Sequence, residues 1–249
     1  MRGMDQNFEN LGVNDLHGHI RSYVLRQARF TNAQSRAYEQ FGEKYILAGL
    51  SGFLNFPAIF GNANPVILEI GFGMGHATAE IASVNPNRNY LAIEVHKPGV
   101  GALIERIVSQ GISNIRILHM DAVPALHELI PFASLTGVHV FFPDPWQKKR
   151  HYKRRLIQPP FLQLLAKACL PGAYLYMATD WEDYACWMVA ALGQTPDWQN
   201  QYPDFAPPLP WRPQTAFERK GLNKDHLIRE IYALRLKNTT HPIKEESST

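Results

Sequence analysis

Residues 65–76 read PVILEIGFGMGH, an apolar run that carries one acid and is followed by three glycines. The run at 66–70 has the length and the near-continuous hydrophobicity of a strand that is buried on both faces. The glycines that follow let the backbone turn tightly before a helix begins. A buried strand, a glycine turn and a helix in this order are typical of a parallel α/β sheet.

The same alternation of strands and helices continues along the chain. Apolar runs predict further strands at 90–95, 115–118, 138–142, 173–178 and 228–237. Helices are predicted at 75–83, 99–110, 122–130, 156–170 and 181–192, and the proline-rich stretch 196–213 predicts an extended loop. Together these elements predict a doubly wound, Rossmann-like α/β sheet, largely parallel, with an antiparallel strand near the C-terminus.

The length of 249 residues and the hydrophobic content of 45% fit one large α/β domain. We expect a basic arm and helical segment at 1–60, the main domain at 61–238 and a disordered tail at 239–249. Within the first segment, residues 21–38 fit two interpretations. They form either an arm that becomes ordered on RNA or a surface helix over the core.

The basic residues are clustered, although the net charge is only +3. They gather at 148–155 and around four arginines near the N-terminus, Arg21, Arg26, Arg29 and Arg36. Clustering of this kind is expected of a phosphate-binding face.

Cys169 and Cys186 provide neither a disulfide framework nor a zinc spacing. The N-terminus lacks the apolar core of a signal peptide, and no apolar run reaches membrane-spanning length. We therefore expect a cytoplasmic protein that binds neither a metal ion nor a membrane.

An acid stands at the end of each of five successive predicted strands. Ligands of doubly wound sheets bind beyond the carboxyl ends of the strands, so these acids are expected to face one site. They are Glu69, Glu94, Asp121, Asp144 and Asp180.

The first of these strand ends indicates which cofactor the site takes. A dinucleotide fingerprint reads GxGxxG, whereas Gly71, Gly73 and Gly75 form GxGxG. A carboxylate at Glu69 would repel a pyrophosphate but suits a ligand that carries a sulfonium or ammonium group. Both observations favour S-adenosylmethionine over NAD, with an acid at Glu94 for the ribose hydroxyls. A carboxylate at Asp121 is placed to accept from the adenine amino group.

Residues 141–155, FFPDPWQKKRHYKRR, join a strand end to a dense basic cluster. The two prolines fix φ and remove backbone donors, so Asp144 is expected in a stiff turn. The basic residues are either the solvated start of a helix or a patch that holds phosphates. Because the neighbouring acids suit a sulfonium nucleoside, we favour the phosphate-binding patch.

With these motifs the sequence resembles a known family, the bacterial tRNA (guanine-N7-)-methyltransferases. The resemblance covers about residues 20 to 237, and its most specific part is Phe142-Pro143-Asp144-Pro145-Trp146 with the basic residues that follow. Supporting segments are Glu69-Ile70-Gly71-Phe72-Gly73, Ala178-Thr179-Asp180, Arg212-Pro213, Thr215-Ala216-Phe217-Glu218, and the arm from Arg21-Ser22-Tyr23 to Arg29. Ala216 departs from the family pattern, which has a basic residue there.

The resemblance implies a class I S-adenosylmethionine-dependent fold and methyl transfer to N7 of a guanosine in tRNA, at position 46 of the variable loop. It implies Asp144 as the catalytic residue, an acidic side chain, and leaves open a monomer or a homodimer. The implied cofactor residues are Glu69, Gly71, Gly73, Glu94, Asp121 and Asp144. The implied substrate residues are Lys148, Asp180, Thr215, Ala216, Phe217 and Glu218. The implied RNA contacts are Arg150, His151, Tyr152, Lys153, Arg154, Arg155, Arg26 and Arg29.

Three rival functions remain open. Asp144-Pro145 also resembles the motif of amino-group methyltransferases, although the second proline of that motif is replaced by Trp146. A non-catalytic RNA-binding module with a methyltransferase fold is disfavoured by the acids at the strand ends. A nicotinamide dehydrogenase is disfavoured by the glycine spacing.

Overall fold

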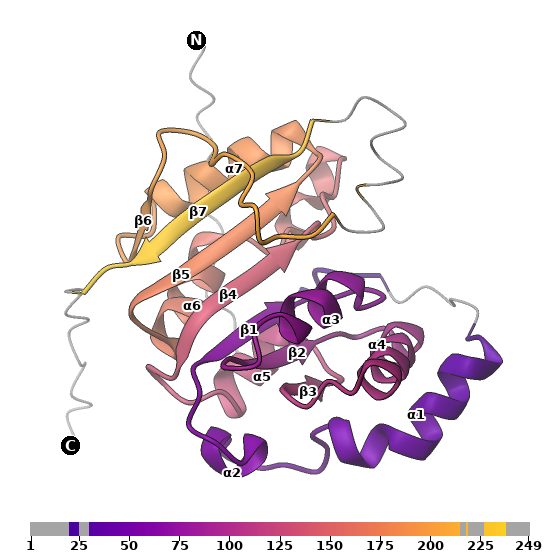
Figure 1. Cartoon of the computed structure of the whole chain (residues 1–249). Coiled ribbons are helices and arrows are strands. Elements are labelled where there is room, and N and C mark those ends of the chain that lie inside the picture. Colours follow the sequence, from indigo (N-terminus) through magenta and orange to yellow (C-terminus); the bar gives the residue numbers. More distant parts are fainter. Residues whose placement is uncertain (1–19, 25–29, 215–217, 219–226, 238–249) are drawn as a thin grey trace, which may run out of the picture.

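The computed structural model describes residues 20–24, 30–214, 218 and 227–237. Within these residues, one seven-stranded sheet forms the centre of the fold (Figure 1). Its strands are β1 (Val66–Ile70), β2 (Asn89–Ile93), β3 (Ile115–Leu118), β4 (Leu135–Phe141), β5 (Cys169–Thr179), β6 (Trp198–Asn200) and β7 (Arg229–Arg235). The helices are α1 (Asn32–Tyr45), α2 (Phe56–Phe60), α3 (His76–Ser83), α4 (Lys97–Gln110), α5 (Ala122–Glu128), α6 (Pro159–Ala168) and α7 (Glu182–Gly193), with a 3-10 helix at Lys149–Arg154.

The strand order is β3-β2-β1-β4-β5-β7-β6. Strands β1 to β5 are parallel, β7 pairs antiparallel with β5, and β6 pairs antiparallel with β7. The first strand, β1, therefore lies at the centre of the sheet. The next two strands run outward to β3, and the chain then returns to β4 on the other side of β1. This confirms the predicted doubly wound, largely parallel sheet with an antiparallel C-terminal strand.

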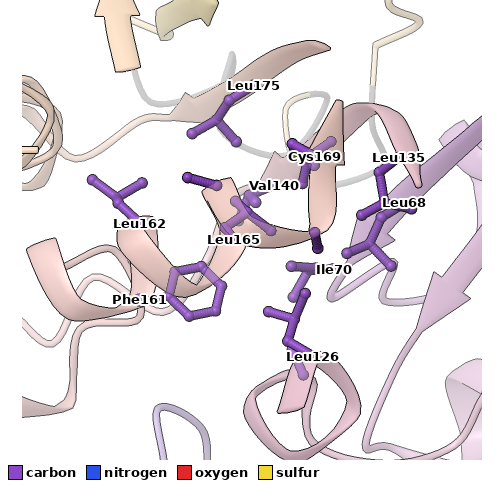
Figure 2. Packing of buried hydrophobic residues seen from close by; sticks show 14 of the residues in the cluster. Leu68, Ile70, Leu126, Leu135, Val140, Phe161, Leu162, Leu165, Cys169 and Leu175 are labelled. Carbon is purple, nitrogen blue, oxygen red and sulfur yellow. The ribbon is translucent and has the colours of Figure 1, made fainter. Parts of the chain in front are cut away.

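Helices cover both faces of the sheet, and the side chains of each strand alternate between them. Leu68 and Ile70 of β1 point toward α5 and α6, where they meet Leu126 and Leu165 (Figure 2). Ile67 points to the opposite face, which α3 and α4 cover. Because each fully buried leucine or isoleucine contributes about 1.5–3 kcal/mol, the two apolar layers hold β1 at the centre of the sheet.

Most predicted elements are present, with shifted ends. The helix predicted at 156–170 is shorter, Pro159–Ala168, because Pro159 and Pro160 lack the N–H groups that an earlier helical turn would need. The prediction of a loop throughout 196–213 was wrong at its start. Residues Trp198–Asn200 form β6, which pairs with β7 and closes that edge of the sheet.

The N-terminal helix α1 packs on α4 (Figure 1). A capping box starts it, because the Thr31 hydroxyl accepts from Gln34 and the Gln34 side chain accepts from the Thr31 N–H. After α1 the Leu47 N–H donates to the Ile117 carbonyl at 2.8 Å, which ties the chain to the outer strand β3. Within the described residues, 32–45 thus form a helix over the core, whereas the predicted RNA contacts Arg26 and Arg29 lie outside them.

His139 is a fully buried histidine on β4. Its Nε2 lies 2.9 Å from the Tyr174 hydroxyl, and its ring stacks on Phe141 with the centroids 5.1 Å apart. Burial lowers its pKa to about 3, so the ring is neutral in the folded protein. His139 is therefore a neutral residue of the core.

We expect acid to destabilise the fold through His139. The unfolded chain binds a proton near pH 6.5 and the folded chain only near pH 3. Stability from this group is therefore complete above about pH 6.5 and falls by about 1.4 kcal/mol per pH unit below it. Urea unfolding between pH 7 and pH 4 should show a shallower pH slope in His139→Phe than in the native protein. His127→Asn, which changes an exposed histidine of α5, should keep the native slope.

Candidate active site

The five predicted acids lie at the same edge of the sheet. Glu69 is the penultimate residue of β1, Glu94 follows β2, and Asp121 caps the helix after β3. Asp144 and Asp180 follow β4 and β5. Because all five strands are parallel, their carboxyl ends meet, as the sequence predicted. The ligand that each acid binds stays a prediction.

Glu69 is a buried carboxylate, with 3% of its surface exposed. Burial raises its pKa to about 7, the neighbouring Thr78 hydroxyl works against this shift, and the negative Glu94 adds to it. Its Oε2 has no hydrogen-bond partner among the described residues. A buried carboxylate oxygen without a donor is a binding position for a cationic group, so Glu69 fits a sulfonium or ammonium ligand.

Glu94 fixes the glycine turn to the end of β2. One carboxylate oxygen accepts from the Gly73 N–H at 2.8 Å, and the other accepts from the N–H groups of Val95 and His96 at 2.7 and 3.0 Å. Gly73 has a φ of 57°, and a Cβ built there would meet nothing within 4 Å. The turn therefore exposes bare backbone next to Glu69, which is what close approach of a ligand requires.

Gly99, in the first turn of α4, is a site residue that sequence analysis missed. A Cβ at this position would lie 2.2 Å from the Gly73 carbonyl oxygen, so only glycine lets α4 reach the turn. The available signal was a glycine as the first residue of the helix predicted at 99–110, a weak helix former that calls for a packing reason.

Residues 20–24 cross the same edge of the sheet. The Trp146 indole N–H donates to the Ser22 carbonyl at 2.8 Å. The Tyr23 hydroxyl faces the Asp121 carboxylate, and burial together with that negative charge raises the pKa of Tyr23. Asp121 also accepts from the Val123 N–H at 2.9 Å. The N-terminal segment thus connects the acid predicted for adenine to the turn that carries Asp144.

The turn that carries Asp144 is held in an unusual conformation. Phe142 and Trp146 have φ values of 53° and 47°, a region that bulky residues rarely occupy. The Phe142 N–H still donates to the Ala178 carbonyl at 2.8 Å, which extends the pairing of β4 with β5 by one residue. Between these two residues Asp144 lies exposed at the surface.

The basic segment after this turn forms a 3-10 helix with exposed cationic side chains. Lys148, Lys149, Arg150 and Lys153 are exposed, and the Arg154 guanidinium lies 4.8 Å from the Trp146 ring centre. His151 and Tyr152 pack edge-on against Trp146 and Trp187.

Arg155 departs from the prediction that it contacts RNA. Only 1% of its surface is exposed, and its guanidinium forms an ion pair with Asp183 at the start of α7. Because the side chain is buried and paired, it is not accessible to an RNA phosphate in this structure. The 3-10 turn points Arg155 inward, whereas its neighbours point to solvent.

The C-terminal segment predicted to bind substrate is joined to the sheet by Arg212. The Arg212 guanidinium donates twice to Glu218, at 2.7 Å each, and also binds Glu230 of β7. All three side chains are nearly buried, and the two carboxylates raise the pKa of Arg212. Glu218 is therefore bound by the protein itself, while Thr215, Ala216 and Phe217 lie outside the described residues. The sequence alone indicated no role for Arg212.

Comparison with known proteins identifies the family. A family described as "Putative methyltransferase" matches residues 63–231. A tRNA (guanine-N(7)-)-methyltransferase of Burkholderia cenocepacia is 52% identical over 220 residues, 88% of this chain and 86% of that protein. One of the same name from Paracidovorax citrulli is 50% identical over 212 residues, 85% of each chain. The chain belongs to the tRNA (guanine-N(7)-)-methyltransferase family.

The fold of this family member is that of class I S-adenosylmethionine-dependent methyltransferases, and S-adenosylmethionine is the implied cofactor. A solved 16S rRNA methyltransferase, KamB, superposes with a TM-score of 0.53 over 85% of this chain and 97% of that chain. At 18% identity this likeness concerns the fold alone. The unpartnered Glu69 oxygen and the bare backbone at Gly73 fit the cofactor's cationic end.

The described residues contain no group of three His, Cys, Asp or Glu side chains arranged to hold a metal ion. In the same part of the chain, no helix combines the length and the hydropathy that crossing a bilayer requires.

Substitution of Gly99 by alanine is expected to weaken S-adenosylmethionine binding at least about tenfold, because the new methyl group displaces the Gly73 carbonyl and with it the turn. Helix propensity alone would make the variant more stable, by up to about 1 kcal/mol. Titration calorimetry measures the change. Gly193→Ala, where a Cβ meets nothing within 4 Å, is the matched control and should bind normally.

Cofactor affinity is expected to fall below pH 7. Glu69 is half protonated near pH 7 in the free protein, and a cationic ligand binds its ionised form. The dissociation constant should therefore rise about tenfold for each pH unit below 7. Calorimetry from pH 5.5 to 8 tests this, with Glu69→Gln expected to bind weakly and without the pH dependence. Glu80→Gln, an exposed acid of α3, should retain it.

Proposed function

We propose that this protein transfers a methyl group from S-adenosylmethionine to N7 of a guanosine in tRNA, forming 7-methylguanosine at position 46 of the variable loop. One observation carries the proposal. The strained turn of Asp144 joins the edge of the sheet that carries the acids directly to an exposed basic helix. A cofactor bound at this edge and an RNA backbone bound on the helix are therefore neighbours. The two relatives described above are both named for this reaction, as tRNA (guanine-N(7)-)-methyltransferases.

S-adenosylmethionine supplies an activated methyl group on its sulfonium. N7 of guanine carries a free lone pair and no proton, so no general base is required of the protein. The protein's task is to hold N7 in line with the methyl group and to exclude other geometries. As the methyl group moves, positive charge develops on the base, and a fixed carboxylate stabilises it.

Asp144 is our first choice for that carboxylate, because its turn places it exposed at the edge of the sheet. There it accepts from the N1–H and the exocyclic amine of guanine or stabilises the charge on the ring. Asp180, at the end of the adjacent strand β5, is the second candidate. Glu218 supports the substrate segment through Arg212.

The RNA backbone lies on the exposed residues of the basic segment, Lys148, Lys149, Arg150 and Lys153, with Arg154 stacked on Trp146. Contacts of this kind make affinity depend on salt, because each neutralised phosphate releases counterions. The proposed setting is the cytoplasm, and the protein acts as a monomer or a homodimer.

Asp144→Ala is expected to lower the rate of methyl transfer by about 100-fold or more, because the fixed charge at the reacting base is lost. The fold should stay intact, since Asp144 is exposed. The assay uses labelled S-adenosylmethionine and tRNA that lacks 7-methylguanosine, followed by digestion and nucleoside analysis. Glu128→Ala, an exposed acid of α5, serves as the control. Near-native rates in Asp144→Ala would remove the residue from catalysis, and label in a different nucleoside would reject N7 of guanosine as the target.

A further inference from the structure

We propose that Arg155 is a positioning residue for Asp144: it acts on the reaction by holding the turn of Asp144 in place and makes no contact with the substrate. The inference rests on the proposed function, since it assumes that Asp144 acts at the reacting base.

Arg155 connects the turn to helix α7. Its Nε donates to the Pro145 carbonyl at 3.0 Å, and Pro145 is the residue directly after Asp144. Its Nη2 pairs with the carboxylate of Asp183, in the first turn of α7. One planar guanidinium thus holds the Asp144 turn at a fixed distance from a rigid helix.

Aromatic rings enclose this guanidinium and keep water from it. The Cζ atom lies 3.6 Å from the ring centre of Tyr152 and 4.9 Å from those of Tyr184 and Trp187. The Tyr184 hydroxyl accepts from the Ile157 N–H, and the Trp187 indole donates to the Ile157 carbonyl. The rings are therefore themselves fixed, and Arg155 has little freedom to move.

The turn needs such an anchor because its backbone is strained. Phe142 and Trp146, on the two sides of Asp144, both occupy the left-handed region. Bulky residues stay in this region only where the surrounding structure forces them to. The Pro145 carbonyl lies between Asp144 and Trp146, so the bond from Arg155 acts on the strained part of the turn.

A small displacement of Asp144 is expected to change the rate of the chemical step more than the binding of either substrate. Alignment of the reacting groups is sensitive to shifts below 1 Å. RNA affinity, in contrast, depends on phosphate contacts made by exposed cations, and Arg155 is not one of them.

The test uses the full-length protein with Arg155→Lys, Asp183→Asn and Glu182→Gln. Lysine keeps the charge but cannot bridge Pro145 and Asp183 with one planar group. Asp183→Asn leaves Arg155 in place and removes the charge that anchors it. Glu182→Gln is the control, because it alters the adjacent exposed acid, which pairs with Arg229.

We expect kcat at saturating tRNA and S-adenosylmethionine to fall about 100-fold in Arg155→Lys and about tenfold in Asp183→Asn. Glu182→Gln should match the native protein, and the dissociation constant for tRNA and its salt slope should be native in all three.

Native kcat in a folded Arg155→Lys protein would overturn the inference. Native kcat in Asp183→Asn would overturn it as well. This second variant provides the test if thermal unfolding shows that Arg155→Lys does not fold. Weakened tRNA binding with a reduced salt slope and native kcat would make Arg155 an RNA contact instead. Failure of the proposed function is separate, since it appears as absence of 7-methylguanosine with the native protein or as an active Asp144→Ala.

Discussion

Five parallel strands end at one edge of the sheet, and this constraint determines where every polar side chain of the site lies. Reversal of the strand order between β1 and β4 places Glu69 and Asp144 at the centre of that edge. The helices then have to begin there, so their first turns carry the supporting contacts: Gly99 in α4, Asp121 at α5 and Asp183 in α7. Removal of a parallel strand would therefore disturb the predicted cofactor residues and the turn of Asp144 together.

The sequence predicted the sheet and the order of the acids because both follow from local patterns. Apolar runs separated by polar or turn residues are sufficient to place β1 to β5, and each acid lies at or within three residues of the end of its run. The short β6 escaped prediction because its three residues carry no periodic pattern, and pairing with the distant β7 makes it a strand.

The local sequence pattern does not predict the direction in which a charged side chain points. Arg154 and Arg155 are adjacent and chemically identical, yet one stacks on Trp146 near the surface and the other is buried beside Asp183. Arg212 likewise has two buried carboxylates as partners, one of them near in sequence and the other on β7. Partners of this kind come from packing of distant elements, and only the folded chain reveals them. The same holds for Gly99, whose need for a bare backbone arises from the turn at Gly73.

The acids at the sheet edge and the cations of the 3-10 helix give the surface a local electric dipole that the small net charge of +3 conceals. A polyanion that approaches this region is attracted by one pole and repelled by the other. For the proposed tRNA substrate, we expect the phosphates to stay on the helix and an uncharged base to enter the acidic side. The dipole would then orient the nucleotide, so that its base and not its phosphate reaches Asp144 before any hydrogen bond forms.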